Sequence, residues 1–405
     1  MRNLLFWILS ITGVIWKRVK KPLFWLLAIV GVLLLILISI TYWHIHTPKI
    51  QVMHDAPLTI KIQALDQWFD DLEKREKFNG TILYAKKGEV LYQRNVGFAD
   101  AAGSIPISNR SSFNLASLSK QMTALAIMLL AYDQKLDFDD PIANYLPELS
   151  GYEGVTIRHL LHHISGMSHH EPLARALLPE GGIMDAKIII SWLQPHKAPP
   201  RFQPGEKFEY NNTGYVLLAE IIERVSGTPF AEFMKTRVFT PLYMVDTTIF
   251  NRLSKESKLK ERVFGFEKEF IFFGKNIPAD LPPSDGIVGD GNVYASALDL
   301  VKWDLALTKG TLLPNEFYNQ AYESGVLNSG GKTEYGFGWR VEEQPAVYHT
   351  GGWAGFFGSI YRDLEQETLL VVLTNSGVFL RPILITNKVL SPKKQGSIAV
   401  SGRSE

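Results

Sequence analysis

The sequence predicts an α+β fold, in which helices flank one antiparallel sheet and a helical lobe is inserted between its strands. Three observations predict it. Strand-like runs occur near both ends of the chain, helical runs dominate from about 115 to 310, and an unbroken apolar run at 23–43 precedes them all. Strands from the two ends should therefore pair with each other, and we expect a transmembrane helix in front of this domain.

The apolar run LFWLLAIVGVLLLILISITYW (23–43) is long enough to cross a membrane. At about 1.5 Å per residue, it can span a hydrocarbon core of roughly 30 Å. Four basic residues stand just before it: Lys17, Arg18, Lys20 and Lys21. By the positive-inside rule this flank stays cytoplasmic, so everything after Tyr42 is exported. The alternative is a cleaved signal peptide, but the run is long for one and no small-x-small cleavage site follows it.

Composition divides the chain into three predicted parts. These are a cytoplasmic N-terminus with the anchor (1–49), one exported domain (50–390) and a polar tail (391–405) that we expect to be disordered. The first part holds six Lys or Arg and no acidic residue, which leaves the rest with 36 basic and 41 acidic residues. This mild acidity argues against nucleic acid as a partner. The absence of cysteine excludes disulfides, thiolate catalysis and Cys-ligated zinc.

The elements of the exported domain follow from periodicity. IQALDQWFDDLEKREKF (62–78) has apolar residues at helical spacing, and 80–100 alternates like two strands joined by a turn at Lys86-Lys87-Gly88. Near the other end, strand-like runs recur at YGFGWRV (335–341), FFGSIYRD (356–363) and TLLVVLTN (368–375). RPILITNKVL follows as a short helix candidate. The helical runs between these two groups form the predicted lobe.

One of those runs, FNLASLSKQMTALAIMLL (113–130), combines Ser117 with Lys120 at the start of an apolar segment. Residues three apart share a helix face, and the positive end of a helix favours an alkoxide. A serine is a weak nucleophile until a base takes its proton, and a desolvated lysine can be that base. The same spacing occurs at three other places: Ser257/Lys260, Ser329/Lys332 and Ser391/Lys394. Only Ser117 precedes a long apolar helix. This favours a catalytic pair over the alternative, in which a surface lysine lies beside a serine that caps the helix.

A second constellation is PGEKFEYNNTGYVLLAEIIERVSG (204–227), which places Tyr210 and Asn212 just ahead of an amphipathic helix. A phenolic oxygen near an ammonium can shuttle protons. An asparagine amide can orient a substrate carbonyl and hold the lysine. The alternative is an ordinary core tyrosine, with Asn211 and Asn212 serving as turn and N-cap.

The third constellation is HTGGWAGFFGSIYRD (349–363), in which His349-Thr350-Gly351-Gly352 precedes a strand. Glycines let a substrate approach the backbone, and a strand-edge N–H can donate into an oxyanion hole. Taken alone, the run is more typical of a Gly-rich hairpin turn than of a catalytic site.

Together, Ser117–Lys120, Tyr210-x-Asn212 and His349-Thr350-Gly351 resemble the three active-site motifs of the serine β-lactamase/penicillin-binding-protein superfamily. The match is closest to its class C-like branch of esterases, D-amino-acid peptidases and related hydrolases. Several other runs also read like members of that branch: TIRHLLHHISGM, DDPIANYLPEL, IIERVSGTPF, YASALDLVKW and YGFGW. The resemblance covers residues 65–390 and implies a β-lactamase/transpeptidase-like fold.

The resemblance also implies catalytic roles. Ser117 attacks a carbonyl and becomes acylated. Lys120 and Tyr210 share proton transfer, with Tyr210 activating the water that deacylates the enzyme. The backbone N–H groups of Ser117 and Gly352 form the oxyanion hole. No cofactor is implied.

Four residues are implied to bind the substrate: Asn212, His349, Thr350 and Gly351. Asn212 is expected to contact Lys120 as well. His349 stands where true β-lactamases have a lysine, and a neutral imidazole attracts a substrate carboxylate less well than an ammonium does. This departure weakens the case for antibiotic hydrolysis as the natural activity.

Two further departures concern structure. The family's usual PLGM reads Pro241-Leu242-Tyr243-Met244 here, so we expect the turn at Tyr243 to differ. The family's threonine is His162. It belongs to a run of five histidines: His159, His162, His163, His169 and His170. Imidazole is a common zinc ligand, but no carboxylate joins these histidines at a recognisable spacing. We therefore expect structural roles for them and no metal.

Two classes of function remain open at this point. The first is a single-pass membrane-anchored hydrolase on the extracytoplasmic side, periplasmic or outer, which acts through an acyl-enzyme. Its substrate would be an ester or an amide, such as a cell-wall-type D-amino-acid peptide or a β-lactam-like compound. The second is a penicillin-binding or sensor module with slow or no turnover. The sequence leaves the substrate and the oligomeric state open.

Overall fold

The computed structural model describes residues 29–32, 35, 50, 52, 56–194, 198–254, 259, 261–270, 273–280, 282–341, 345–376 and 389–390. The chain forms two compact units, Met1–Lys49 and Ile50–Glu405. Most of the predicted anchor (23–43) and the whole predicted tail (391–405) lie outside the described residues. Within the described part, no helix is long and apolar enough to cross a membrane.

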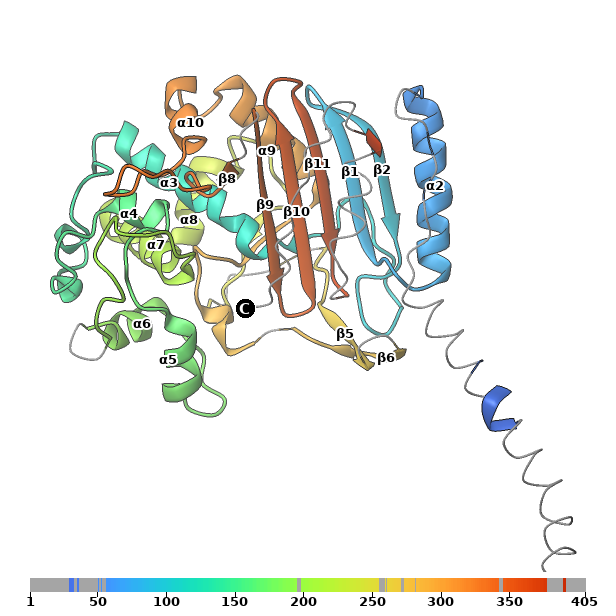
Figure 1. Ribbon diagram of the computed structural model, residues 1–405, viewed down its shortest axis with the longest axis horizontal. Helices are drawn as coiled ribbons and strands as arrows, with labels where there is room; N and C mark the ends of the chain where they lie inside the picture. Colours follow the sequence, from blue (N-terminus) through green and yellow to red (C-terminus); the bar gives the residue numbers. More distant parts are fainter. Residues whose placement is uncertain are drawn as a thin grey trace, which may run out of the picture. The chain divides into compact units, whose positions relative to one another are not determined.

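The second unit is built on a six-stranded antiparallel sheet with the order β2-β1-β11-β10-β9-β8. Its strands are β1 (Gly80–Lys86), β2 (Glu89–Val96), β8 (Arg340–Val341), β9 (Ala346–Trp353), β10 (Phe356–Asp363) and β11 (Thr368–Thr374). Figure 1 shows the first hairpin in blue beside the last strands in red. The pairing of β1 with β11 confirms that both ends of the domain make one sheet, with a mixed α+β architecture around it.

Both faces of this sheet are covered by other parts of the domain. This agrees with the continuous apolar run TLLVVLT in β11. Alternate residues of a strand point to opposite faces. Leu369 and Val371 face the core that contains the helical lobe, whereas Leu370 and Val372 face a second core beneath the N-terminal helix. A strand buried on both faces is apolar along its whole length, and every residue of β11 is buried.

The N-terminal helix α2 (Leu58–Lys74) covers that second face (Figure 1). It begins four residues earlier than the predicted 62–78, directly after Pro57, and its buried stripe contains Leu65, Trp68 and Phe69. Pro57 fixes the entry because proline is compatible with a helix start but not with a helix interior. The helix therefore exists as predicted, with shifted ends.

The helical lobe lies between β2 and β8 in the sequence. Its α-helices are α3 (Lys120–Tyr132), α4 (Ile157–Leu161), α5 (His170–Leu177), α6 (Ala186–Trp192), α7 (Asn212–Ser226), α8 (Phe230–Met234), α9 (Ala297–Lys309) and α10 (Asn315–Ala321). Short helical turns join them: η1 (Ala116–Ser119), η2 (Ile142–Asn144), η3 (Pro147–Leu149), η4 (Lys235–Phe239) and η5 (Pro283–Gly286). Helix α3 packs against α7, and both contribute to the main core.

Two small sheets were not predicted. One has the order β3-β7-β4, from Phe113–Asn114, Val293–Ala295 and Thr248–Ile249. The other is the hairpin β5–β6, from Phe266–Phe270 and Phe273–Pro278. Strand β3 leads directly into η1, so the first small sheet fixes the chain just before Ser117.

Two strand predictions need correction. The predicted strand 335–341 is regular only at Arg340–Val341, because Gly338 turns the chain with a φ of +78°. The run from His349 to Gly352 lies inside β9, whereas the sequence placed it before a strand. Paired glycines hid β9 from a search based on strand propensity.

Candidate active site

Ser117 lies in η1, just before helix α3 begins. The residue before it, Ala116, has a φ of +47°, a conformation that is uncommon for a residue with a side chain. The Asn114 side chain holds it there by accepting a hydrogen bond from the Ala116 N–H at 2.8 Å. Strained backbone of this kind persists only where its surroundings fix it, and it is enriched at functional sites.

Lys120 is fully buried beside Ser117. Its Nζ donates to Ser117 Oγ at 3.1 Å and to the backbone oxygen of Asp290 at 2.7 Å. The same Nζ lies 5.2 Å from the ring centre of Tyr210 and 5.6 Å from that of Tyr215. The lysine therefore has two oxygen partners and two aromatic walls. The pairing that the sequence spacing predicted is present, and the lysine does not lie at the surface.

Tyr210 approaches this pair from the start of α7. Its hydroxyl is buried and, among the described residues, has no hydrogen-bond partner. The ring packs against His163 with centroids 4.3 Å apart, and the Arg340 guanidinium carbon lies 5.9 Å from its centre. A buried polar atom without a partner is rare in folded proteins and suggests a place reserved for a ligand or water.

The two asparagines after Tyr210 have different functions. Asn211 is the N-cap of α7: its side chain accepts from the Thr213 N–H at 2.8 Å and donates to the Met167 oxygen at 2.7 Å. The capping alternative is thus correct for Asn211 but not for Asn212. Asn212 donates its amide to Glu171 Oε1 at 2.7 Å, whereas the sequence predicted a contact with Lys120.

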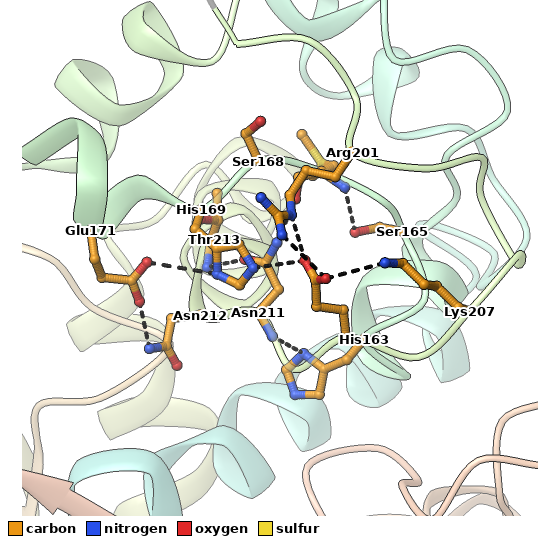
Figure 2. A network of polar contacts seen from close by, with 12 residues as sticks. His163, Ser165, Ser168, His169, Glu171, Arg201, Lys207, Asn211, Asn212 and Thr213 are labelled. Atoms are coloured by element: carbon orange, nitrogen blue, oxygen red, sulfur yellow. Dashed lines mark hydrogen bonds and ion pairs between the residues drawn. The ribbon is translucent and has the colours of Figure 1, made fainter. Parts of the chain in front are cut away.

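Glu171 belongs to a polar network that joins α5 to the start of α7 (Figure 2). His169 Nε2 lies 3.0 Å from Glu209 Oε1, and Arg201 Nε donates to the same Glu209 oxygen at 2.6 Å. The bond from Arg201 dominates in lowering the pKa of Glu209 to about 2, and the bond from His169 adds to it. Glu209 is therefore ionised throughout the physiological pH range.

Strand β9 brings the third motif to Ser117 through a close approach at Gly351. A Cβ at this position would lie 2.9 Å from the Ser117 backbone nitrogen and 2.7 Å from the Leu115 oxygen. No side chain larger than hydrogen fits there without displacing η1. The next residue, Gly352, lines the same cavity as Ser117. This geometry is compatible with the predicted oxyanion hole, whose function stays a prediction.

His349 lies beside this strand contact with only 2% of its surface exposed. Its Nδ1 faces the Thr350 backbone oxygen at 2.6 Å, so this nitrogen must carry the proton. Nε2 then accepts from the Tyr335 hydroxyl at 2.8 Å. Burial, aided by Lys120 and Arg340, lowers the pKa of His349 to about 3. The imidazole is neutral and both nitrogens are occupied. Its predicted contact with substrate stays a prediction.

A small cavity opens at Ser117. Its volume is about 50 Å³, room for a few water molecules. Besides Ser117 and Gly352, its lining includes Asn212, Asp290 and Trp353. The predicted site residues Thr350 and Gly351 lie one and two positions before Gly352 on the same strand. Three of the predicted residues, Ser117, Asn212 and Gly352, therefore line one cavity.

The remaining histidines have protein partners. His159 closes a capping box with Thr156, His163 Nδ1 accepts from the Asn211 N–H at 3.1 Å, and His170 lies 3.1 Å from Thr213 Oγ1. No group of three metal-binding side chains occurs in the described ranges. The absence of a metal stays a prediction.

His162, which replaces the family's threonine, is buried against the Tyr335 backbone oxygen at 2.9 Å. A Cβ on Gly325 would come within 2.8 Å of its ring. The glycine thus makes room for the larger side chain. Burial lowers the pKa of His162 to about 4, so it is neutral at ordinary pH.

Sequence reasoning missed several residues of the site: Glu171, Asp285, Asp290, Arg340 and Trp353. Trp353 donates its indole N–H to Asp285 Oδ1 at 3.0 Å and forms one wall of the cavity. Asp290 contributes a backbone oxygen, which every residue type has, so no sequence pattern could predict it. The only available signal was Trp353, an aromatic residue directly after the glycines of the third motif.

Comparisons with known proteins match most of this chain. A family model described as β-lactamase matches residues 65–387. Penicillin-binding protein 4* of Bacillus subtilis is 34% identical over 325 residues, which cover 78% of this chain and 72% of that protein. An octameric penicillin-binding protein homologue from Pyrococcus abyssi has a TM-score of 0.68 at 26% identity, with 80% of this chain and 76% of that chain covered. A D-amino acid amidase from Ochrobactrum anthropi also has a TM-score of 0.68, at 23% identity, with 83% and 98% covered.

Proposed function

This chain belongs to the β-lactamase family, the superfamily of serine β-lactamases and penicillin-binding proteins, and on that premise we propose that it hydrolyses an ester or an amide through an acyl-enzyme on Ser117. The observation that carries the proposal is the 3.1 Å contact between Lys120 Nζ and Ser117 Oγ, buried behind a cavity. A nucleophile within hydrogen-bond reach of a base is the basic requirement of serine catalysis.

Acylation follows from the geometry around Ser117. The neutral amine of Lys120, or the phenolate of Tyr210, takes the hydroxyl proton as Oγ bonds to the substrate carbonyl carbon. The carbonyl oxygen becomes an oxyanion, and we expect the backbone N–H groups of Ser117 and Gly352, two residues of the cavity lining, to stabilise it. When the carbon–oxygen or carbon–nitrogen bond breaks, the proton passes to the leaving group. The Nζ of Lys120 keeps its position during acylation because it donates a hydrogen bond to the backbone oxygen of Asp290.

Deacylation needs a base that activates a water molecule for attack on the acyl carbon. The buried hydroxyl of Tyr210 has no hydrogen-bond partner among the described residues. As the phenolate it takes a proton from a water whose oxygen bonds to the acyl carbon, and that proton passes to Ser117 Oγ as the bond between the acyl carbon and Oγ breaks. The Tyr210 ring lies close to the Nζ of Lys120 and the guanidinium of Arg340.

The charge of the site bears on the substrate. His349 is neutral and has no free nitrogen, so this position offers no cation to a substrate carboxylate. At the position of His349, nothing therefore favours a substrate with an anionic group over a neutral ester or amide. Penicillin binding with slow turnover remains the second candidate, favoured by the 34% identity to a penicillin-binding protein.

The test is hydrolysis of p-nitrophenyl butyrate by the compact unit Ile50–Glu405. Ser117→Ala should lower kcat/KM by about a thousandfold or more, because the nucleophile is lost. The matched control is Ser329→Ala, which alters an exposed serine that also precedes a lysine by three residues, Lys332. It should keep full activity. Equal activity in the wild type and Ser117→Ala would contradict the proposal.

We also propose that residues 23–43 anchor the protein in a membrane, with the hydrolase domain on the extracytoplasmic side. The support is the apolar run and its basic flank in the sequence. Fractionation of cells that express the whole chain should place it with the membranes, resistant to extraction by high salt or alkali. A mature protein that starts after residue 43 in a soluble fraction would overturn this proposal.

A further inference from the structure

Among the described residues that line the cavity at Ser117, Trp353 has the largest side chain. The others are no larger than isoleucine. Two elements form the wall to which the indole belongs: strand β9 carries Trp353 itself, and η5 with the residue after it contributes Ser284 and Ile287. The acylation and deacylation steps do not use Trp353. The position of its ring nevertheless determines how much space a substrate finds beside Ser117.

A two-residue hairpin turn fixes the backbone of Trp353. Trp353 pairs with Phe356 across the strands. Between them, Ala354 and Gly355 have φ values of +43° and +82°. Positive φ at both central residues is the pattern of tight two-residue hairpins, and it is uncommon for alanine. The turn is also packed on β5, since a Cβ on Gly355 would lie 2.7 Å from the Phe266 nitrogen. The strand therefore presents Trp353 from a rigid base.

Asp285 holds the indole from the other element of this wall. The indole N–H donates to Asp285 Oδ1 at 3.0 Å. Asp285 is buried and belongs to η5, where it lies between the cavity residues Ser284 and Ile287. The Trp353 side chain therefore reaches from β9 to η5, and one hydrogen bond joins the two parts of the wall.

Backbone contacts fix η5 in turn. The Asp285 backbone oxygen accepts from the Arg252 N–H at 2.9 Å, and the Pro283 oxygen accepts from the Met184 N–H at 2.9 Å. A side chain on Gly286 would collide with the Met184 oxygen, so the two segments are in close contact. Because both η5 and the end of β9 are held, the bond to Asp285 gives the indole a defined position.

We propose that Trp353 limits the length of the acyl group, and that Asp285 is the positioning residue that holds it in place. This rests on the proposed function and narrows its substrate class to esters and amides of short carboxylic acids. The acyl group stays bound to Ser117 between the two steps, so it is the part of the substrate that the cavity must hold. A volume of about 50 Å³ has room for a few water-sized groups, such as those of an acetyl or propanoyl group. A longer chain must displace the indole, which breaks its buried hydrogen bond to Asp285.

The experiment compares p-nitrophenyl acetate with p-nitrophenyl hexanoate on the compact unit Ile50–Glu405. The wild type should favour the acetate in kcat/KM. Trp353→Ala should shift the ratio of the two kcat/KM values towards the hexanoate by about tenfold, the effect of burying two further methylene groups. The ratio does not depend on how much of each variant is folded. The matched control is Trp192→Ala, which removes a half-buried tryptophan of α6 outside the cavity lining and should keep the wild-type ratio.

Two variants of different chemistry test the positioning role of Asp285. Asp285→Asn keeps an oxygen for the indole and should keep the wild-type ratio. Asp285→Leu has a similar shape but cannot accept a hydrogen bond, so it should shift the ratio in the same direction as Trp353→Ala. A role in stability alone would change the activity towards both esters equally.

A second readout does not need turnover. The indole N–H of Trp353 can be followed by nitrogen-15 NMR and assigned with Trp353→Phe. It should exchange with solvent faster in Asp285→Leu than in the wild type or Asp285→Asn. A wild type that favours the hexanoate, or equal ratios in the wild type and Trp353→Ala, would overturn the length limit. Equal ratios and exchange rates in Asp285→Leu and Asp285→Asn would overturn the role of Asp285. If the wild type hydrolyses neither ester, the proposed function fails, and the exchange rates still decide whether Asp285 holds Trp353.

Discussion

His349 illustrates how much chemistry depends on the neighbours of a single residue. The resemblance led us to compare His349 with the lysine typical of true β-lactamases, and charge was the only property that could be compared. In the folded chain the Thr350 oxygen fixes its tautomer and the Tyr335 hydroxyl occupies its other nitrogen. Positive charge near Tyr210 comes instead from Lys120 and Arg340. Neither the tautomer nor the contact with Tyr335 is visible in a motif.

Tyr243 carries the second departure from the family at the residue scale. The sequence predicted a turn that differs from the family's, and this stays a prediction. In this chain Tyr243 adopts a φ of +56°, the left-handed conformation that a glycine favours, and its side chain is 77% exposed.

Tyr243→Gly should therefore raise the free energy of unfolding by about 0.5–1 kcal/mol. Relief of left-handed strain, about 1–2 kcal/mol, exceeds the extra entropy that glycine gives the unfolded chain. Chemical denaturation of the compact unit measures it. Tyr243→Ala is the control, because alanine removes the same exposed ring but keeps the strain. A gain of the same size in both variants would show that the ring, and not the backbone, is responsible.

At the scale of elements, the site depends on how closely strand β9 approaches η1. The strand carries Gly351 against the Ser117 backbone nitrogen, and its next residue reaches the cavity. Gly338 allows a similarly close approach to helix α3, where a Cβ would lie 2.5 Å from the Gln121 Cα. Glycine is required at both positions because the backbones themselves are in contact.

Gly351→Ala should destabilise the fold by about 1–3 kcal/mol, because an extra methyl in a packed contact forces the backbone to move. It should also slow ester hydrolysis strongly, since the displaced segment carries Ser117. Gly352→Ala is the control for stability: its Cβ would meet only ordinary contacts, the nearest at 3.7 Å from the Phe357 ring. Thermal or chemical unfolding checks both variants. Equal stability of the two would mean that β9 and η1 are less tightly packed than described.

For the whole molecule, the periodicity of apolar residues predicted the helices and strands better than it predicted the contacts between them. The strands at both ends and the amphipathic helix could be predicted because their apolar patterns are long. Strand β9 was missed because its glycines lack strand propensity, and the short strands of the β3-β7-β4 sheet carry too few residues for a pattern. Of the site, residues within motifs were predicted. Glu171 and Asp290 were not, because their partners are distant in sequence and are brought near only by folding.

Stability should depend on pH through Asp285, which is 1% exposed. Burial, opposed by the Trp353 indole, raises the pKa of its carboxyl from 3.8 to about 6. A raised carboxyl pKa stabilises the folded state fully below about pH 4, and this contribution is lost as the pH rises through 6. Relative to Asp285→Asn, whose oxygen can still accept from the indole, the wild type should lose about 2 kcal/mol between pH 4 and 7.

Urea denaturation of both proteins at unit steps from pH 4 to 7 measures this difference. The two arginines that also act on Asp285, Arg252 and Arg262, stay charged throughout the range, so they do not blur the comparison. A difference between wild type and Asp285→Asn that does not change with pH would show that the carboxyl has an ordinary pKa.

The most direct test of the central claim is the intact mass of the compact unit Ile50–Glu405 after treatment with a fluorophosphonate, which phosphonylates activated serines. We predict one adduct on the wild type, located on Ser117 by peptide mapping, and none on Ser117→Ala. Lys120→Ala should form it far more slowly, because the serine then lacks its base. An adduct of the same size and rate on Ser117→Ala would contradict the assignment of the nucleophile and the mechanism that depends on it.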